Sequence, residues 1–302
     1  PGAWAIWWGT SLTILETPIM NILPSLTHSL LSTTAIAAAL VASPASATLL
    51  FGQGGDIAWT SPVLELNGSA HAYDPGTGTV LRLTDNVGSQ AGTAFFENPY
   101  VLGHNSDFST SFTFQISSPG NPLTNRSDGL ALVIATSPTS LGGGGGGMGY
   151  GSVSPLVPSL AIEFDTHWNG FDVSDSHIGV MKNGNETLHL AQTNVPAPMD
   201  NGDVWKATIN YFGQGDLLVV SLVDLNNPTV TTSLSYTIDI AGLMGCGTAG
   251  CVNSYFGLSA GTGGGFANHD ILAWSLAVPE PGSLLLSALG LGSLGGVMRR
   301  RR

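Results

Sequence analysis

The chain has 302 residues, of which 43% are hydrophobic and only 9% are charged, and its formal net charge is −12 at pH 7. Four of its eight basic residues form the terminal run 299–302, so the stretch 48–277 carries 18 acidic and 4 basic residues, a net charge near −14. A surface of that sign repels a phosphate backbone, which excludes nucleic acid as a partner.

The N-terminal 47 residues have the order of an export signal. The chain begins with Pro1 rather than Met, and we expect residues 1–19 to be an upstream extension of the gene model. Residues 20–47 combine a polar start, an alanine-rich apolar stretch at 32–41 and a small-residue site that ends at Ala47. This order predicts a signal peptide that is cleaved after Ala47, although its start lacks lysine and arginine.

The remaining body, residues 48–277, has a length that suits one large β-sandwich or barrel. Short runs of β-favouring residues are separated by Gly, Asn, Asp and Pro, and no long helical period competes with them. This pattern predicts an all-β sandwich. The predicted strands are 79–83, 108–116, 129–134, 160–165, 177–180, 204–211, 216–222, 230–236, 255–259 and 271–276.

A run of six glycines at 142–147 lies between two of these strands. Such a run usually indicates a flexible linker, but a linker has no purpose inside a continuous domain. The alternative is that the backbone must come very close to a ligand, which glycine permits. The run lacks the Lys-Ser/Thr pair of a phosphate-binding loop, so we do not expect nucleotide binding.

The segment 163–177 concentrates acidic, amide and imidazole side chains in a chain that is otherwise poor in charge. Carboxylate and amide oxygens suit Ca²⁺, whereas imidazole beside carboxylates suits Mn²⁺ or Zn²⁺, so one segment has ligands for two unlike metals. The competing interpretation is a solvated acidic loop.

Alternation along 159–165 favours the metal interpretation. It places the side chains of Glu163, Asp165 and His167 on one face of a strand. The pair Asn169 and Gly170 would end that strand, and the loop could then fold Asp172 and His177 back toward the same face.

Cysteine and histidine usage adds one further feature. Cys246 and Cys251 are close in sequence, and in an oxidising compartment such a pair most simply forms a small-loop disulfide. His71, His104 and His189 occur singly, and we interpret them as surface or packing residues.

The C-terminal segment 278–302 contains Pro-Glu-Pro at 279–281, an apolar run at 283–298 and the four arginines. The run is marginal for spanning a bilayer, and the arginines would stay on the cytoplasmic side. This order resembles the PEP-CTERM sorting signal of Gram-negative bacteria. The resemblance implies export, a transient anchor in the inner membrane, processing by an exosortase and a final place at the outer surface or outside the cell.

Four segments of the body, in the family's order, resemble the L-type lectins, the legume-lectin type with bacterial and animal relatives. They are 127–134, the glycine loop at 141–151, the metal segment with its closing 177–180, and 257–263 followed by 269–276. The resemblance covers about 79–276 and implies one domain with the concanavalin-like jelly-roll β-sandwich. His269 lies in one of these motifs, at the entrance of a strand, and we expect a structural role for it.

The same resemblance implies two metal sites. The transition-metal ligands, for Mn²⁺ or a related ion, would be the side chains of Glu163, Asp165, Asp172 and His177. The Ca²⁺ ligands would be Asp165, Asn169, Asp172 and the backbone carbonyl of His167. We place the second aspartate at Asp172 because it lies five residues before the histidine, as in many members; Asp175 is the alternative.

The sugar contacts implied by the resemblance lie around the metal segment. Asp128, preceded by a cis peptide bond from Ser127, would accept hydrogen bonds from two sugar hydroxyls. The backbone amide of Gly146 and the side-chain amide of Asn169 would add to the polar grip, and Gly264 and Gly265 lie where the specificity loop donates a backbone amide. Position 167 commonly holds an aromatic residue that stacks on the sugar, and here either His167 or Trp168 has the ring for it.

We therefore predict an exported lectin that holds a glycan or exopolysaccharide reversibly and without catalysis. One alternative is a glycoside hydrolase of the related glucanase-like sandwiches, whose Glu-x-Asp-x-Glu motif supplies two carboxylates; here the second glutamate is replaced by His167. The other alternative is a structural extracellular-matrix protein that has lost sugar binding. The retained Asp128, glycine loop and Asn169 argue against it, since a core needs none of them.

Overall fold

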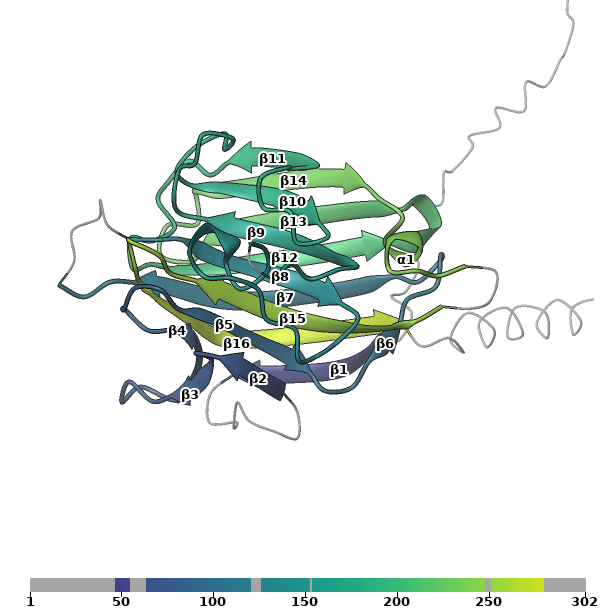
Figure 1. Cartoon of the computed structure of the whole chain (residues 1–302), viewed down its shortest axis with the longest axis horizontal. Coiled ribbons are helices and arrows are strands. Elements are labelled where there is room, and N and C mark those ends of the chain that lie inside the picture. Colours follow the sequence, from purple (N-terminus) through teal and green to yellow (C-terminus); the bar gives the residue numbers. More distant parts are fainter. Residues whose placement is uncertain (1–46, 55–63, 121–125, 153, 248–250, 280–302) are drawn as a thin grey trace, which may run out of the picture. The chain divides into compact units, whose positions relative to one another are not determined.

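The computed structural model describes residues 47–54, 64–120, 126–152, 154–247 and 251–279, and for residues 47–54 and 279 only the backbone. All of them belong to one compact unit, residues 43–302. They are almost entirely β-structure, arranged in two sheets whose strand pairs are all antiparallel (Figure 1).

The first sheet, named here the β7 sheet, has eight strands. In spatial order they are β14 (Thr231–Thr237), β13 (Leu217–Asp224), β12 (Val204–Phe212), β7 (Phe108–Ser117), β16 (Asn268–Pro279), β4 (Val80–Thr84) and β3 (His71–Tyr73), with β1 (Ala47–Gly54) also paired to β16.

The second sheet, named here the β9 sheet, also has eight strands. In spatial order they are β11 (Ala191–Asn194), β10 (His177–Lys182), β9 (Ser159–Asp165), β8 (Gly129–Ala135), β15 (Asn253–Gly261), β5 (Ala91–Phe96) and β2 (Leu64–Gly68), with β6 (Tyr100–Val101) also paired to β15. The short helices of the described ranges are α1 (Ile240–Leu243) and the 3-10 turns η2 (Gly145–Gly147) and η3 (Gly213–Gly215).

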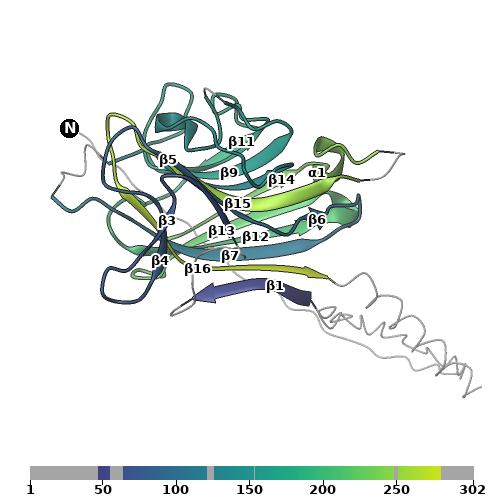
Figure 2. The same ribbon diagram turned by 60° about the horizontal axis from the view of Figure 1, so that its bottom comes forward.

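The two sheets form a sandwich, as predicted, and Figure 2 shows them as two layers. All ten predicted strands are present, with ends within three residues of the predicted limits. The strands that the sequence pattern missed are β1, β2, β3, β5, β6 and β11. β3, β6 and β11 have only two to four residues, too few for an alternation to be recognised.

The core lies between the sheets and is built by alternation. In β7, buried residues alternate with more exposed ones along the whole strand, so one face packs inward. Phe112 on β7 meets Phe164 on β9 edge to face, with ring centroids 5.6 Å apart. Such aromatic pairs add about 0.5 to 1.5 kcal/mol beyond the area they bury, so they help to hold the layers in register.

Strand β9 is buried on both of its faces. Leu160, Ile162 and Phe164 belong to the core between the sheets. Ala161 faces the other way and packs with Tyr150 and other residues of a separate apolar cluster under the glycine loop. Because side chains alternate along a strand, Glu163 and Asp165 lie on that same outer face. The fold thus places two carboxylates under a covering layer of loops.

Three predicted features concern the ends of the body and the cysteines. Cys246 and Cys251 form the predicted disulfide. β16 continues to Pro279, two residues beyond the predicted end of the body at Ala277. No helix among the described residues is long and apolar enough to cross a membrane. The predicted signal peptide, apart from Ala47, and the predicted membrane run at 283–298 lie outside the described residues.

Candidate functional site

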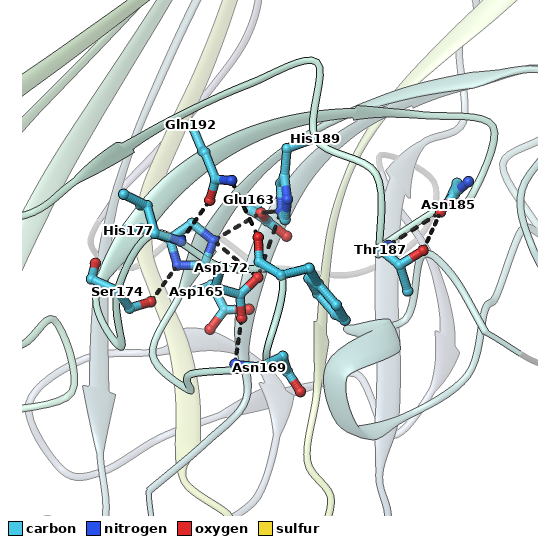
Figure 3. Close-up of polar contacts among 12 residues, drawn as sticks. Glu163, Asp165, Asn169, Asp172, Ser174, His177, Asn185, Thr187, His189 and Gln192 are labelled. Atoms are coloured by element: carbon cyan, nitrogen blue, oxygen red, sulfur yellow. Dashed lines mark hydrogen bonds and ion pairs between the residues drawn. The ribbon is translucent and has the colours of Figure 1, made fainter.

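The candidate site lies at the connection between β9 and β10. The two strands pair with Asp165 opposite His177 and with Glu163 opposite Gly179. The connecting loop therefore starts and ends at two potential ligands. Figure 3 shows the acidic and imidazole side chains of this region pointing toward one another.

The side chains of Glu163, Asp165, Asp172, His177 and His189 form what is called here the cluster. Glu163 lies at its centre and is buried. Its Oε1 atom accepts a hydrogen bond from His177 Nε2 at 3.1 Å and a shorter one from His189 Nε2. The absence of a side chain on Gly179 makes room for it, since a Cβ there would lie 2.1 Å from Glu163 Oε1.

Asp172 folds back over the cluster from the connecting loop. Its Oδ2 atom accepts a hydrogen bond from the backbone amide of Asn169 at 2.6 Å. Its Oδ1 atom lies 3.8 Å from His177 Nε2 and 4.0 Å from His189 Nε2, and it is buried and accepts no hydrogen bond from the residues that the structure describes. A buried carboxylate oxygen without a partner is costly, so this atom is a vacant acceptor that points into the cluster.

The electrostatics of the cluster are unbalanced. Burial raises the pKa of Asp165 well above its usual range, and repulsion from Glu163, Asp172 and Asp128 contributes to the increase. Burial also disfavours the charged form of Glu163, but its hydrogen bonds from His177 and His189 outweigh burial and lower its pKa. None of the ion pairs of these four carboxylates involves a lysine or an arginine.

Two overlapping groups of side chains have ligand atoms close enough to share an ion. One group is Glu163, His177 and His189, and the other is Asp165, Asp172 and His177. Carboxylate and imidazole donors gathered around excess negative charge are the environment that divalent cations occupy in proteins. The residues present therefore fit a cation at this position.

The two predicted candidates for the second aspartate lie in different surroundings. Asp172 is in the cluster, whereas Asp175 is exposed and belongs to neither group.

The sequence analysis interpreted His189 as a surface or packing residue and did not connect it with the metal segment. Its side chain is only 4% exposed and hydrogen-bonds Glu163, whereas the His71 and His104 side chains are partly exposed. His189 was missed because it lies 12 residues beyond His177, across a turn, and just before the unpredicted strand β11.

The predicted sugar-contact residues lie beside the cluster. They belong to a surface called here the rim, which is formed by Asp128, the glycine loop near Gly146, the segment 167–169 and the turn 263–265. Asp128 follows a cis peptide bond, as expected, and is mostly buried. A Cβ on Gly263 would lie 3.2 Å from Asp128 Oδ2, and one on Gly146 would lie 3.9 Å from the side-chain nitrogen of Asn169. A Cβ on Gly145 would lie 3.9 Å from Gly263. Three chain segments thus converge beside Asp128.

Burial raises the pKa of Asp128 to about 6, while the charge of nearby His167 acts in the opposite direction. Its Oδ2 atom is buried and accepts no hydrogen bond of normal geometry from the described residues. His167 therefore lies close enough to Asp128 to influence it, whereas the Trp168 side chain is 58% exposed.

The glycine run is a closely packed loop and not a linker. The backbone amide of Gly145 donates to the carbonyl of Thr262 at 2.9 Å, and that of Gly142 donates to Gly149 at 2.7 Å. A Cβ on Gly144 would lie 2.5 Å from the carbonyl oxygen of Gln90. These close approaches explain part of the glycine content without a ligand.

The turn at 263–265 closes this side of the rim. The Gly263 amide donates to the carbonyl of Gly265 at 3.0 Å, and the space around Gly264 is open.

A Gly-x-Ser-x-Gly pattern at 257–261 carries no nucleophile, although it matches the serine-hydrolase motif. Ser259 is fully buried inside strand β15, not at the tip of a strand-to-helix turn.

Comparison with known proteins gives one consistent family. The legume lectin domain matches residues 60–284, and the PEP-CTERM protein-sorting motif matches residues 277–302. The basic agglutinin of Psophocarpus tetragonolobus is 31% identical over 222 residues, which are 68% of this chain and 87% of the agglutinin. The leucoagglutinating phytohemagglutinin of Phaseolus vulgaris is 32% identical over 234 residues, which are 71% of this chain and 80% of that protein.

Solved structures agree with the sequence relatives. The crystal structure of basic winged bean lectin with Tn-antigen matches with a TM-score of 0.65 and 28% identity, over 77% of this chain and 98% of that one. The family and these neighbours indicate a carbohydrate-binding protein rather than an enzyme, and the sorting motif indicates an exported one. The chain belongs to the legume lectin family and ends in a PEP-CTERM sorting motif.

Proposed function

We propose that the rim around Asp128 binds a glycan reversibly and that cations bound beneath it hold the rim in shape. The contact residues would be Asp128, Gly146, His167, Asn169, Gly264 and Gly265. The observation that carries the proposal is the buried Oδ2 atom of Asp128, which accepts no hydrogen bond of normal geometry within the described ranges and lies where three chain segments meet.

The chemistry of the rim suits a sugar. A buried acceptor that lacks a partner costs free energy, and a sugar hydroxyl that donates to Asp128 would recover it. The side-chain amide of Asn169 lies next to Gly146 and adds a donor and an acceptor. His167 is close enough to Asp128 to influence its pKa, so we propose His167, ahead of Trp168, as the residue that packs against the sugar.

Two cations would hold the loop 166–176 in place. We propose that Ca²⁺ binds Asp165, Asn169, Asp172 and the backbone carbonyl of His167. We propose that Mn²⁺ or a related ion binds Glu163, Asp165, Asp172 and His177. The ions would neutralise carboxylates that otherwise repel one another and would fix the side chain of Asn169 on the rim.

Glycan binding with and without a chelator tests the proposal. The first probe is the Tn-antigen present in the winged bean lectin structure, followed by a glycan array. We expect chelation or Asp128→Asn to weaken binding at least about ten-fold. The control is Asp175→Asn, which should bind normally because Asp175 is an exposed residue of the loop 166–176. Binding that survives both chelation and Asp128→Asn would refute the mechanism.

The route out of the cell is a further part of the proposal. We propose that residues 20–47 are removed as a signal peptide, that 48–277 form the sugar-binding body, and that an exosortase processes 278–302 after a transient inner-membrane stage. The body would then meet exopolysaccharide at the outer surface or outside the cell. Intact-mass analysis of the exported protein tests this, since a mature form that begins elsewhere than Thr48 or retains the arginine tail would contradict it.

A further inference from the structure

We propose that His189 is a direct ligand of the transition-metal position, which gives this position a second imidazole. His189 would join the ligands proposed above, Glu163, Asp165, Asp172 and His177, and the site would favour Zn²⁺, Co²⁺ or Ni²⁺ over Mn²⁺ more strongly than a one-histidine site does. This inference rests on the proposed function only in requiring that a cation binds the cluster.

The fold holds His189 in position. Strand β11 pairs with β10 so that Ala191 lies opposite Val180, and the Leu190 amide donates to the Val180 carbonyl at 2.7 Å. His189, immediately before, is thereby held above Gly179. A Cβ on Gly179 would lie 2.7 Å from the ring of His189 and 2.1 Å from Glu163 Oε1. Glycine at 179 thus leaves room for both ligands.

The ligand atoms of Glu163, His177 and His189 all lie within 4.8 Å of one another. His177 Nε2 lies 3.1 Å from Glu163 Oε1 and 3.8 Å from Asp172 Oδ1. His189 Nε2 contacts the same Glu163 oxygen and lies 4.0 Å from the same Asp172 oxygen. Ligands held about 2.0 to 2.2 Å from one zinc ion lie roughly 3 to 4 Å from one another, which is close to the distances of His177 from Glu163 and of both histidines from Asp172.

The surroundings supply the features that usually accompany a metal-bound histidine. His177 Nδ1 donates to the carbonyl oxygen of Ser174 at 3.0 Å, which directs Nε2 into the cluster. The two imidazole rings meet nearly at right angles, with centroids 5.5 Å apart, so their Nε2 atoms approach the centre from different sides. The Oδ1 atom of Asp172 is buried, unpartnered and directed between them.

The expected selectivity follows from ligand chemistry. Oxygen ligands and water suit Mn²⁺, whereas imidazole suits Zn²⁺, Ni²⁺ and Cu²⁺. Most nitrogen and oxygen sites already bind Zn²⁺ more tightly than Mn²⁺. A preference for Zn²⁺ therefore does not by itself show that His189 is a ligand. The informative quantity is the change in the ratio of Zn²⁺ to Mn²⁺ affinity when the second imidazole is removed.

Competitive metal titration of the exported body, followed by metal analysis, tests the inference with His189→Gln. We expect the Zn²⁺ affinity to fall at least about ten-fold, while the Mn²⁺ affinity falls much less. His104→Gln is the matched control, because His104 is an exposed histidine paired with Asp239. Equal losses for both ions, or no loss, would overturn the inference.

X-ray absorption of the Zn²⁺-loaded, unaltered protein gives a second readout that does not depend on a variant that folds. Two imidazole ligands per zinc are expected, and a single one would overturn the inference. In that event chelator-sensitive glycan binding would still stand, so the proposed function would survive. A protein that binds no cation at all would contradict both.

Discussion

Two sites in this protein contain buried carboxylates, and they differ in the side chains that surround those carboxylates. In the β7 sheet, Asp270 receives two parallel hydrogen bonds from Arg82, at 2.7 and 2.8 Å. At the β9–β10 connection, buried carboxylates face one another and two histidines, and Asp172 Oδ1 has no hydrogen-bond donor in the described part of the chain. The first site is completed by the chain itself.

The difference separates a structural ion pair from a binding site. An isolated buried charge is very costly, so a fold either supplies the opposite charge or leaves the position to a solute. The Arg82–Asp270 pair follows the first course. We propose that the cluster around Glu163 follows the second, in which case its stability should depend on dissolved cations.

The largest expected effect comes from breaking the paired site. Arg82→Met leaves Asp270 buried and unpaired, which should reduce the free energy of unfolding by about 3 to 5 kcal/mol. Urea unfolding measures this loss. The loss should be equal with and without chelator, and a loss that depends on the chelator would remove the contrast between the two sites.

A buried histidine whose pKa is set by burial and not by an acidic side chain sharpens the comparison. Burial lowers the pKa of His269 to about 3, and His269 hydrogen-bonds Thr84 at 2.7 Å. The unfolded chain takes up this proton near pH 6.5, whereas the folded chain does not until about pH 3. Stability should therefore fall as the pH falls through this window, by about 2 kcal/mol between pH 7 and 5.

Urea unfolding at several pH values checks this for the unaltered protein and for His269→Gln. The variant lacks the titrating group, so its stability should depend less on pH over the same range. Parallel curves for the two proteins would show that His269 does not titrate in this way.

A smaller effect on stability is expected at Asp172, and it should differ between the chelated protein and the protein with added cations. Asp172→Asn keeps an oxygen to accept the Asn169 amide but removes one repelling charge. The chelated protein should become more stable by on the order of 1 kcal/mol, and the stabilisation by added cations should shrink. Thermal unfolding with chelator and with added Ca²⁺ and Zn²⁺ measures both; lower stability in chelator would contradict the repulsion.

The smallest effect is expected at Asp175, which is exposed on the same loop. Asp175→Asn should change the free energy of unfolding by no more than about 0.5 kcal/mol, and it should preserve the stabilisation by cations. The same thermal measurements apply. Loss of the cation effect in this variant would show that Asp175, not Asp172, is the ligand.

Much of the fold could be predicted from sequence because its long strands alternate or are uniformly apolar. β7 and β9 were recognisable for this reason, whereas β5 begins with Ala-Gly-Thr-Ala and gives little strand signal. β5 is a strand because it pairs with β15 and β2 on either side. Pairing of that kind is a property of the assembled sheet and leaves a weak trace in the local sequence.

The candidate site divides in the same way. Glu163, Asp165 and His177 were identifiable because they lie in one short segment with ligand-like spacing. His189 was not, because its approach to Glu163 depends on the pairing of β10 with β11 and on the empty position at Gly179.

The sequence by itself determined the sandwich class, the acidic segment at 163–177 and the sorting motif, because each is a local or periodic pattern. Only the tertiary structure decided which buried carboxylates pair with an arginine and which face histidines, that the glycine loop packs on the 261–263 segment, and that a second histidine enters the cluster. Those features arise where segments distant in sequence are brought within a few ångströms. The distances that join them are set by sheet pairing and packing, which no single segment encodes.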